Sequence, residues 1–187
     1  GVELSGRYQL NRLQIEGSFS ASRNKIEAFT EFVDNWATGE QQAIPHEETD
    51  LAFSPNFIGH AIVGYLLVEE EQSQLQLGLL SKYVGRQYID NTQRESASID
   101  PYFFSDARLE YTWQPGWLKQ LRAYVLVRNL WDARFATNAW NYRFVSPGFD
   151  PRVSDPYAQQ ESGDVYNLTG FFPQAGRNIM VGLELDF

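Results

Sequence analysis

The chain has no cysteine among its 187 residues, and this absence excludes several kinds of chemistry. Without thiols there is no disulfide framework, no thiolate nucleophile and no metal site built on sulfur. Only two histidines are present. No Ser-His-Asp set can be assembled, and no glycine-rich phosphate loop follows a strand and opens a helix. We therefore expect no catalytic residue, no cofactor and no enzyme activity.

Basic residues and long apolar runs are also scarce. Lys and Arg number 15 against 24 Asp and Glu, which gives a net charge of -9 and argues against a nucleic-acid partner. No run of about 18 apolar residues exists, so the sequence predicts no membrane-spanning helix. A strand that crosses lipid needs only about 9–11 residues of alternating character, so a membrane is not excluded.

Aromatic residues and period-two alternation are abundant instead. Aromatics make up 15% of the chain. In residues 13–22, for example, Leu13, Ile15 and Phe19 alternate with polar side chains, which places the two sets on opposite faces of a strand. Seven such segments are present: residues 2–8, 13–22, 57–67, 75–88, 103–113, 121–131 and 176–187.

The polar faces and the connections point to a particular β architecture. Asp106, Arg108 and Glu110 put both charge signs on one face, which indicates a wet face braced by ion pairs. Several segments look about 12–20 residues long, longer than the usual strand of about 5–6 residues. Short and long connections alternate along the chain. The short ones are residues 9–12, 69–73 and 114–117, and the long ones are residues 34–52, 90–98 and 132–175.

Alternating short turns and long loops are typical of an antiparallel transmembrane β-barrel in a cell outer membrane. The apolar face then meets outer-membrane lipid and the charged face lines the lumen. Two alternatives stay open: a passive pore or small barrel complete in itself, and a soluble barrel whose apolar face encloses a lipid-like molecule. Whether the protein needs detergent to stay dispersed distinguishes the two membrane-barrel hypotheses from the soluble-barrel hypothesis.

The strand count carries a further expectation. Seven is an odd number and puts the two ends of the chain on opposite sides, whereas bacterial single-chain barrels have an even number of strands. We therefore expect residues 1–187 to be the C-terminal strands of a larger barrel, with the N-terminal strands lying outside this chain.

Three motifs resemble one family over essentially the whole chain. The segments 82-KYVGRQYIDNT-92, 124-YVLVRNLWDARF-135 and 171-FFPQAGRNIMVGLELDF-187 resemble the C-terminal barrel of TonB-dependent outer-membrane receptors, in the iron- and siderophore-receptor branch. The resemblance implies a 22-stranded barrel, an N-terminal plug domain that this chain lacks, and energy supplied by a TonB complex through an N-terminal segment. It implies uptake of an iron-siderophore or similar chelate; glycan or cobalamin import is the alternative.

The end of the chain carries a second feature of such proteins. Outer-membrane proteins similar to this one hold an assembly signal in the last strand, which the barrel-assembly machinery reads. Gly182, Leu185 and Phe187 match its last fixed points, whereas Met180 stands where a polar residue is usual. Phe187 is expected in the aromatic belt at the membrane interface.

Ligand contacts are expected in the long loop of residues 132–175. Trp140, Tyr142 and Phe144 with Arg143 combine flat rings and one planar cation, which suits an anionic metal chelate through stacking and charge. The alternative is that these aromatic residues pack the loop onto itself or mark the outer interface.

The remaining charged residues predict structure rather than chemistry. His46 stands beside acidic residues, and we interpret residues 46–50 as a solvated acidic loop rather than a weak cation site, so no metal is expected. His60 alternates among apolar residues and is expected to be packed or to face the lumen. Across two hairpins, Arg7 is expected near Glu16 and Glu110 near Arg122.

Overall fold

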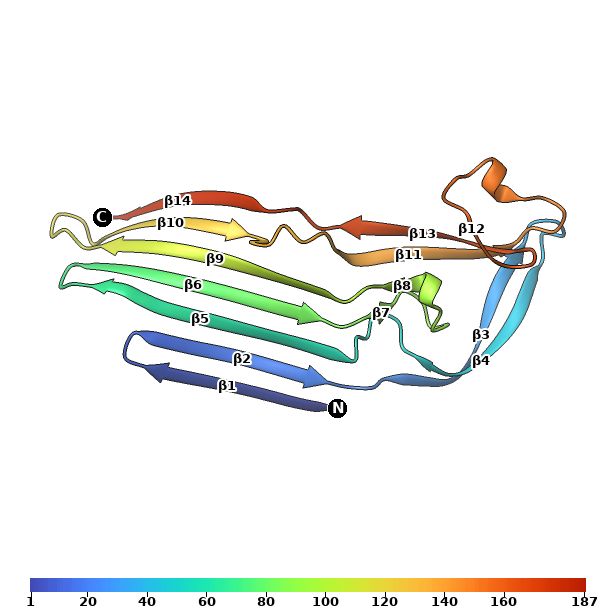
Figure 1. The fold of residues 1–187 in the computed structure, drawn as a ribbon, viewed down its shortest axis with the longest axis horizontal. Helices are drawn as coiled ribbons and strands as arrows, with labels where there is room; N and C mark the ends of the chain where they lie inside the picture. Colours follow the sequence, from blue (N-terminus) through green and yellow to red (C-terminus); the bar gives the residue numbers. More distant parts are fainter.

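Seven strands form one antiparallel sheet in the computed structural model, which describes residues 1–187 (Figure 1). They follow the order of the seven predicted segments, so the predicted all-β fold with antiparallel sheets is confirmed. The strands are β1 Val2–Leu10, β2 Leu13–Ala21, β5 Phe57–Glu69, β6 Ser73–Val84, β9 Tyr102–Trp113, β10 Gln120–Arg128 and β14 Asn178–Asp186. None of the molecule's helices has the length and apolar character to span a membrane.

Tight connections join these strands at one end of the sheet. Asn11 and Arg12 link β1 to β2, and Asn11 adopts the left-handed conformation, with a φ of 48°, that asparagine tolerates in turns. Residues 70–72 and 114–119 make the other two short links. At the opposite end three long segments leave the sheet: residues 22–56, 85–101 and 129–177. We call these segments the excursions. The N-terminus lies near that end and the C-terminus lies at the short turns (Figure 1), as predicted.

Strand lengths agree with the lower end of the predicted range and not with its upper end. β5, β6 and β9 have 13, 12 and 12 residues, whereas β1, β2, β10 and β14 have 9 each. The chain stays extended beyond these strands but changes sheet: β2 ends at Ala21, and the next strand begins at Lys25 after a short break. Period-two alternation does not reveal such a break, because extended backbone continues on either side of it.

The long connections are not simple loops, contrary to prediction. They contain a second sheet with the strand order β12-β13-β11-β3-β4 and a two-stranded pair, β7 with β8. β11 and β3 are parallel where they meet, with Phe144 opposite Asp34. The strands are β3 Lys25–Asn35, β4 Gln41–Asp50, β7 Gln87–Tyr88, β8 Ser98–Ile99, β11 Ala136–Val145, β12 Gln159–Ser162 and β13 Val165–Pro173. Two short 3₁₀ helices, Glu95–Ala97 and Pro151–Val153, lie between them.

The residues of β4 explain why alternation does not predict the β3–β4 hairpin. It contains Pro45, Glu47 and Glu48, which are residue types that strands disfavour. β4 is an edge strand, where proline is tolerated because one side of the strand needs no partner. The acidic residues 46–50, expected in a loop, therefore belong to a strand.

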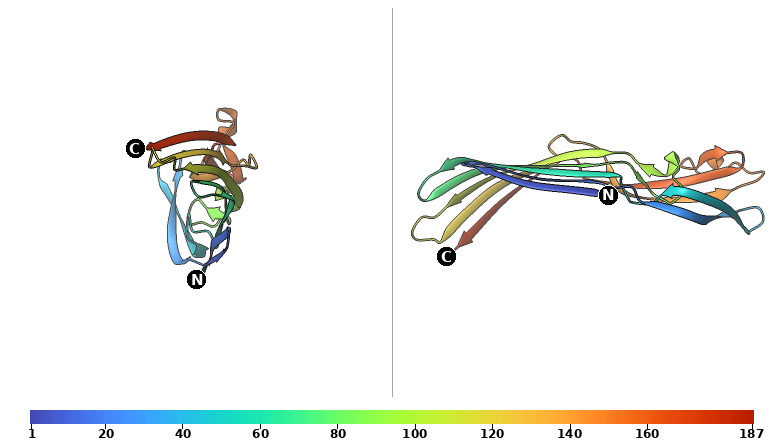
Figure 2. Two further views of the ribbon diagram at one scale, coloured as in Figure 1. Left: turned by 90° about the vertical axis from the view of Figure 1, so that its left-hand side faces the viewer. Right: turned by 90° about the horizontal axis from the view of Figure 1, so that it is seen from below.

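The packed core lies in the excursions and not beneath the seven-stranded sheet. Phe144 and Val33 are almost fully buried there, whereas Val84 is the one buried hydrophobic residue within the large sheet. Figure 2 shows that this sheet is a curved single layer that continues into the excursions. No second layer covers either of its faces.

The two faces of this layer differ in chemistry as predicted. One row across four strands pairs Leu77 with Leu109, Leu109 with Val125, and Val125 with Val181. Leu109 and Val125 are each 40% exposed, and Val181 is 77% exposed. We call this side the apolar face and the opposite side the polar face.

The last strand holds its glycine under a tyrosine ring. Tyr124 lies directly opposite Gly182, and a Cβ on Gly182 would stand inside the volume of that ring. Leu185 alternates onto the apolar face, and Phe187 follows the strand and is 78% exposed. Gly182 thus has a packing reason of its own, besides its place in the predicted assembly signal.

Replacing Gly182 by alanine is expected to lower the free energy of unfolding by about 1–3 kcal/mol, because the new methyl group would displace the Tyr124 ring from its position over β14. Gly78→Ala is the matched control on the same face, since its Cβ would meet the Arg108 carbonyl oxygen at an ordinary 3.8 Å. Adding Tyr124→Ser should restore the stability of Gly182→Ala. Equal denaturation midpoints for the two alanine variants would contradict this packing.

Candidate functional site

The polar face of the sheet carries interlocked charges near the short turns. Arg122 Nη1 lies 2.8 Å from Glu184 Oε2, and Arg122 Nε lies 3.5 Å from Glu110 Oε1. Arg108 pairs with Glu110 along the same strand, and its guanidinium stacks over the Tyr124 ring. The predicted Glu110–Arg122 proximity is confirmed, and Arg7 is directly opposite Glu16 in the register. These charges pair with one another across three strands, and Arg122 Nε is buried without a hydrogen bond.

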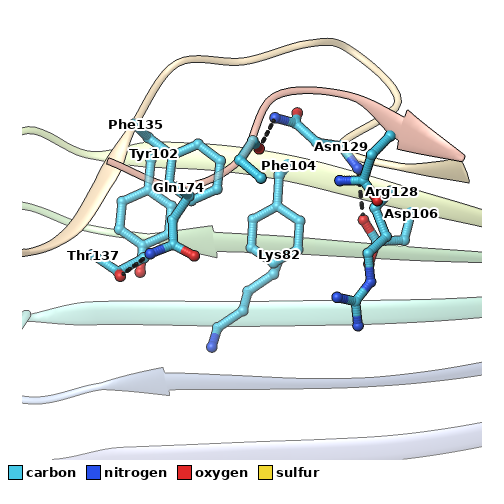
Figure 3. A pocket seen from close by; sticks show the side chains of 11 residues that line it. Lys82, Tyr102, Phe104, Asp106, Arg128, Asn129, Phe135, Thr137 and Gln174 are labelled. Atoms are coloured by element: carbon cyan, nitrogen blue, oxygen red, sulfur yellow. Dashed lines mark hydrogen bonds between the residues drawn. The ribbon is translucent and has the colours of Figure 1, made fainter. Parts of the chain in front are cut away.

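A hollow of about 340 Å³ opens on the same face where the sheet meets the excursions (Figure 3). We call it the junction pocket. Strands β6, β9, β10, β11 and β14 and the links after β10 and β13 supply its wall. Its lining residues are Lys82, Tyr102, Phe104, Asp106, Arg128, Asn129, Phe135, Thr137, Gln174, Ala175 and Asn178.

Three nearly parallel rings form one wall of the junction pocket. Phe135 stacks on Tyr102, with ring centroids 4.7 Å apart and planes 14° apart. Its centroid is also 5.5 Å from that of Phe104, with planes 8° apart. Tyr102 and Phe104 occupy alternate positions of β9 and therefore share a face. The three rings are therefore stacked on one another, not arranged in one plane, and they line one side of the pocket.

Hydrogen bonds to backbone groups hold the link that carries Phe135. The buried Asn129 side chain donates from Nδ2 to the Ala133 carbonyl oxygen at 2.9 Å, and its Oδ1 accepts the Ala133 N–H at 2.9 Å. The Gln174 N–H donates to the carbonyl oxygen of Phe135 itself, also at 2.9 Å. The third ring is therefore held in place by the turn and by the strand that returns beside it.

Two cations of the junction pocket have no partner. None of the molecule's ion pairs or side-chain hydrogen bonds includes Lys82 Nζ or the Arg128 guanidinium. The one carboxylate in the lining, that of Asp106, accepts the Asn129 N–H at 2.9 Å. The pocket therefore offers free positive charge beside an aromatic wall.

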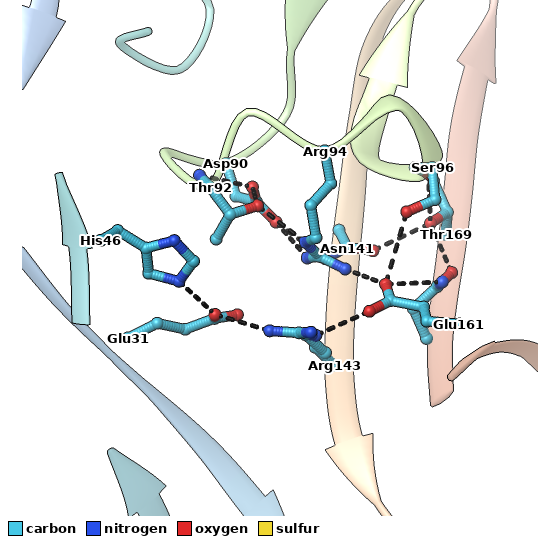
Figure 4. A network of polar contacts seen from close by, with 11 residues as sticks. Glu31, His46, Asp90, Thr92, Arg94, Ser96, Asn141, Arg143, Glu161 and Thr169 are labelled. Carbon is cyan, nitrogen blue, oxygen red and sulfur yellow. Dashed lines mark hydrogen bonds and ion pairs between the residues drawn. The ribbon is translucent and has the colours of Figure 1, made fainter. Parts of the chain in front are cut away.

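A network of charged side chains joins the excursions to one another (Figure 4). We call Glu31, Asp90, Arg94, Arg143 and Glu161 the charged clamp. Arg143 lies 2.8 Å from both Glu31 and Glu161, and Arg94 pairs with Glu161 and, at 2.8 Å, with Asp90. Because β3, β11, β12 and the link between β6 and β9 supply these residues, the clamp holds three excursions together.

The predicted ligand residues do not form a single site. Trp140, Tyr142 and Phe144 occupy alternate positions of β11, so Arg143 points to the other side of the strand. Arg143 is engaged in the charged clamp. The buried Phe144 ring stacks on Trp36 at a centroid distance of 3.9 Å, which is a packing contact. Trp140 lies across Gly170 and is 49% exposed.

Both histidines make ordinary structural contacts. His46 Nε2 lies 2.8 Å from Glu31 Oε2, and its ring stacks on Phe29. This strand position corrects the expectation of a solvated loop for residues 46–50. His60 is part-buried on the polar face and its Nδ1 lies 2.9 Å from the hydroxyl of Ser18. No group of three His, Cys, Asp or Glu side chains is arranged to hold a metal ion.

Asp34 and Tyr142 make a short polar relay between β3 and β11. The Gln41 amide and the Tyr142 hydroxyl both donate to the Asp34 carboxylate, and these bonds lower the pKa of Asp34. Burial, together with the neighbouring carboxylate, raises the pKa of Tyr142. Trp36 Nε1 donates to the same tyrosine oxygen at 3.2 Å.

Comparisons with known proteins find a likeness in structure but none in sequence. No family model matches the sequence, and no curated protein matches it. The fold is similar to the crystal structure of the ferric yersiniabactin uptake receptor FyuA from Yersinia pestis, with a TM-score of 0.47 and 14% sequence identity. The match covers 99% of this chain and 29% of that receptor. A likeness at this TM-score carries no conclusion about function.

Glu161→Gln is expected to release the three excursions from one another. The substitution leaves Arg94 and Arg143, both 16% exposed, with one carboxylate fewer, and breaking such a partly buried pair costs about 3–5 kcal/mol. Hydrogen exchange should accelerate in residues 90–99 and in β11. Glu48→Gln is the control, because its pair with Lys25 is exposed. Unchanged protection in Glu161→Gln would show that the clamp is not what joins them.

Acid should break the relay at a pH below the usual aspartate pKa of about 3.9. Because the folded-state pKa of Asp34 is lowered, its contribution is complete above the ordinary value and is lost as pH falls through the lowered one. A fluorescence titration that follows Trp36 should show this step, and Asp34→Asn should abolish it. A step above the ordinary value would contradict the assignment.

Proposed function

We propose that this chain is part of the wall of an outer-membrane transport barrel, with the apolar face against lipid and the polar face towards a water-filled bore. The single observation that carries the proposal is the uncovered apolar face. In a soluble two-layer fold this face would be buried against another layer. Here the side chains on this face stay exposed: Leu109 is 40% exposed, Leu4 64%, Leu183 65% and Val181 77%.

Aromatic residues border the apolar face at both ends of the strands. Towards the excursions, the Phe19 ring packs edge-on against Phe57 at 4.3 Å, and the Phe57 ring packs against Tyr83 at 5.8 Å. Phe103 lies directly opposite Tyr83 and continues this row. Towards the short turns a second group is present: Tyr65, Tyr111, Trp113, Trp117 and Phe187. Two such girdles are typical of barrels that cross a bilayer.

The separation of the two girdles fits a membrane. Phe103 and Trp113 stand ten positions apart on β9. Ten residues of strand extend about 33 Å at about 3.3 Å per residue. At a tilt of about 40° to the membrane normal this becomes about 25 Å, the height of the apolar band of outer-membrane barrels.

An imported iron chelate is the proposed cargo. The resemblance of residues 82–92, 124–135 and 171–187 to siderophore receptors supports this class of ligand. The excursions stand at the end of the sheet away from the short turns, where an external ligand would arrive, and the junction pocket lies below them. A plug domain and a TonB complex would complete the transporter, and binding and passage, not catalysis, are the proposed activities.

A charge placed in the middle of the apolar face provides the test. In the complete barrel, reconstituted in lipid vesicles, Leu109→Arg should lower the free energy of unfolding by about 2–4 kcal/mol, because the guanidinium would lie near the bilayer midplane. Gln76→Arg is the matched control, since Gln76 faces Glu110 on the polar face.

The same pair distinguishes a membrane wall from a soluble sheet. On a soluble surface a residue that is 40% exposed accepts arginine with little change in stability. If Leu109→Arg and Gln76→Arg unfold at the same urea concentration in vesicles, or if the protein is monodisperse without detergent, the proposal fails.

A further inference from the structure

A second hollow lies on the apolar face of the large sheet, towards the short turns. Its volume is about 190 Å³, and we call it the Ala123 hollow. Hydrophobic side chains of β6, β9, β10 and β14 surround Ala123: Leu75, Leu109, Tyr111, Val125 and Val181. The junction pocket opens on the other face, so the sheet itself separates the two hollows.

The strand register produces the Ala123 hollow. Ala123 stands directly opposite Tyr111 on β9 and directly opposite Leu183 on β14. Val125, two positions further along β10, also has aliphatic side chains opposite it on both neighbouring strands. Ala123 is the smallest side chain of these two rows, so its methyl group leaves a gap that the larger side chains around it border.

We propose that the Ala123 hollow binds one acyl chain of a phospholipid, in the membrane leaflet on the side of the short turns, and that Lys119 holds the phosphate group of the same lipid. This inference rests on the proposed function, because it requires the apolar face to meet lipid. It goes beyond that function by assigning one lipid molecule to a fixed place on the barrel wall.

The lining of the Ala123 hollow selects a hydrocarbon chain. Every residue of the lining is hydrophobic, so a polar group placed there would lose its hydrogen bonds to water without replacement. Water is a poor occupant for the same reason. Leu109, Tyr111 and Val181 are between 39% and 77% exposed, so the hollow opens outward. A flexible chain can therefore lie in it without entering the sheet.

The depth of the Ala123 hollow matches the upper part of an acyl chain. Leu109 borders the hollow, and Trp113 of the girdle near the short turns follows on the same face of β9. The strand between these two residues extends about 13 Å, which becomes about 10 Å along the membrane normal at a tilt of about 40°. One leaflet contributes about 15 Å of hydrocarbon. The hollow therefore lies beside the part of the chain nearer the headgroup.

Lys119 supplies a positive charge at the headgroup level. It is exposed and lies in the link between β9 and β10, four positions before Ala123. Its N–H donates to the Asp186 carbonyl oxygen at 3.0 Å, which holds the link beside the end of β14. None of the molecule's ion pairs includes its ammonium group. A phosphate above the hollow would therefore gain a charge-assisted hydrogen bond from a long side chain suited to the interface.

Native mass spectrometry tests the acyl-chain contact. The complete barrel is reconstituted in phospholipid vesicles and released in mild detergent, and the phospholipids that stay bound are counted. Ala123→Leu should lower retention of the most tightly bound phospholipid at least about fourfold, because the new side chain fills the hollow and displaces methylene groups. Ala123→Gly, which leaves the hollow open, should retain the lipid.

Ala107→Leu is the matched control for the acyl-chain contact, because Ala107 lies on the same face, on β9, and outside the hollow. It should retain the phospholipid. Retention by Ala123→Leu that equals that of the unaltered chain, or an equal loss in both leucine variants, would overturn the proposal.

The phosphate contact has its own variant. Lys119→Gln should lower retention of the same phospholipid about fivefold, because one lysine near a membrane surface contributes about that much to phosphate attraction. Arg12→Gln is the control, since it removes a cation from the short turn between β1 and β2, away from β10. Equal retention in these two variants would show that Lys119 does not hold the headgroup.

Membrane insertion is measured separately, so the two proposals fail in different ways. If Leu109→Arg is more destabilising in vesicles than Gln76→Arg but Ala123→Leu keeps the phospholipid, the membrane wall stands and the lipid site falls. If Leu109→Arg and Gln76→Arg behave alike and no variant retains a phospholipid, both proposals fail.

Discussion

The structure depends on the separation of apolar and polar side chains onto opposite faces of a single curved layer. Backbone hydrogen bonds between neighbouring strands hold the layer together, and no second layer shields its apolar side. In the proposed barrel, lipid covers the apolar face and water covers the polar face. The aromatic rows lie on the apolar face of this sheet, and the charged pairs and the junction pocket lie on its polar face.

Cohesion has a different origin in the two halves of the molecule. In the large sheet it comes from long antiparallel ladders and from close cross-strand fits such as Tyr124 over Gly182. In the excursions it comes from a small core around Phe144 and from the charged clamp. The junction pocket lies where these two kinds of packing meet, and its third ring, Phe135, belongs to the link between them.

Alternation predicted what local sequence determines. The seven segments, their faces and the Glu110–Arg122 contact follow from period two, because strand geometry fixes which side chains share a face. The β3–β4 hairpin was missed, since Pro45 and its acidic neighbours are untypical of strands. Trp140, Tyr142 and Phe144 already showed the alternation of β11, but their ring chemistry was read as a ligand motif instead.

The site could not be predicted in the same way. Lys82, Arg128 and Phe135 meet only after three separate strands and links are placed side by side, and Phe135 belongs to a link with no periodic pattern. The charged clamp likewise collects residues 31, 90, 94, 143 and 161 from distant parts of the chain. Long-range assembly, and not local propensity, decides these contacts.

Pro45 gives the outermost rim of the second sheet a property of its own. An unpaired strand border invites pairing with an identical border on a neighbouring molecule. Pro45 removes one N–H from β4, Glu47 and Glu48 add like charges, and Glu48 bends the backbone with a φ of 54°. Neighbouring copies would therefore repel one another along this edge strand instead of pairing through it.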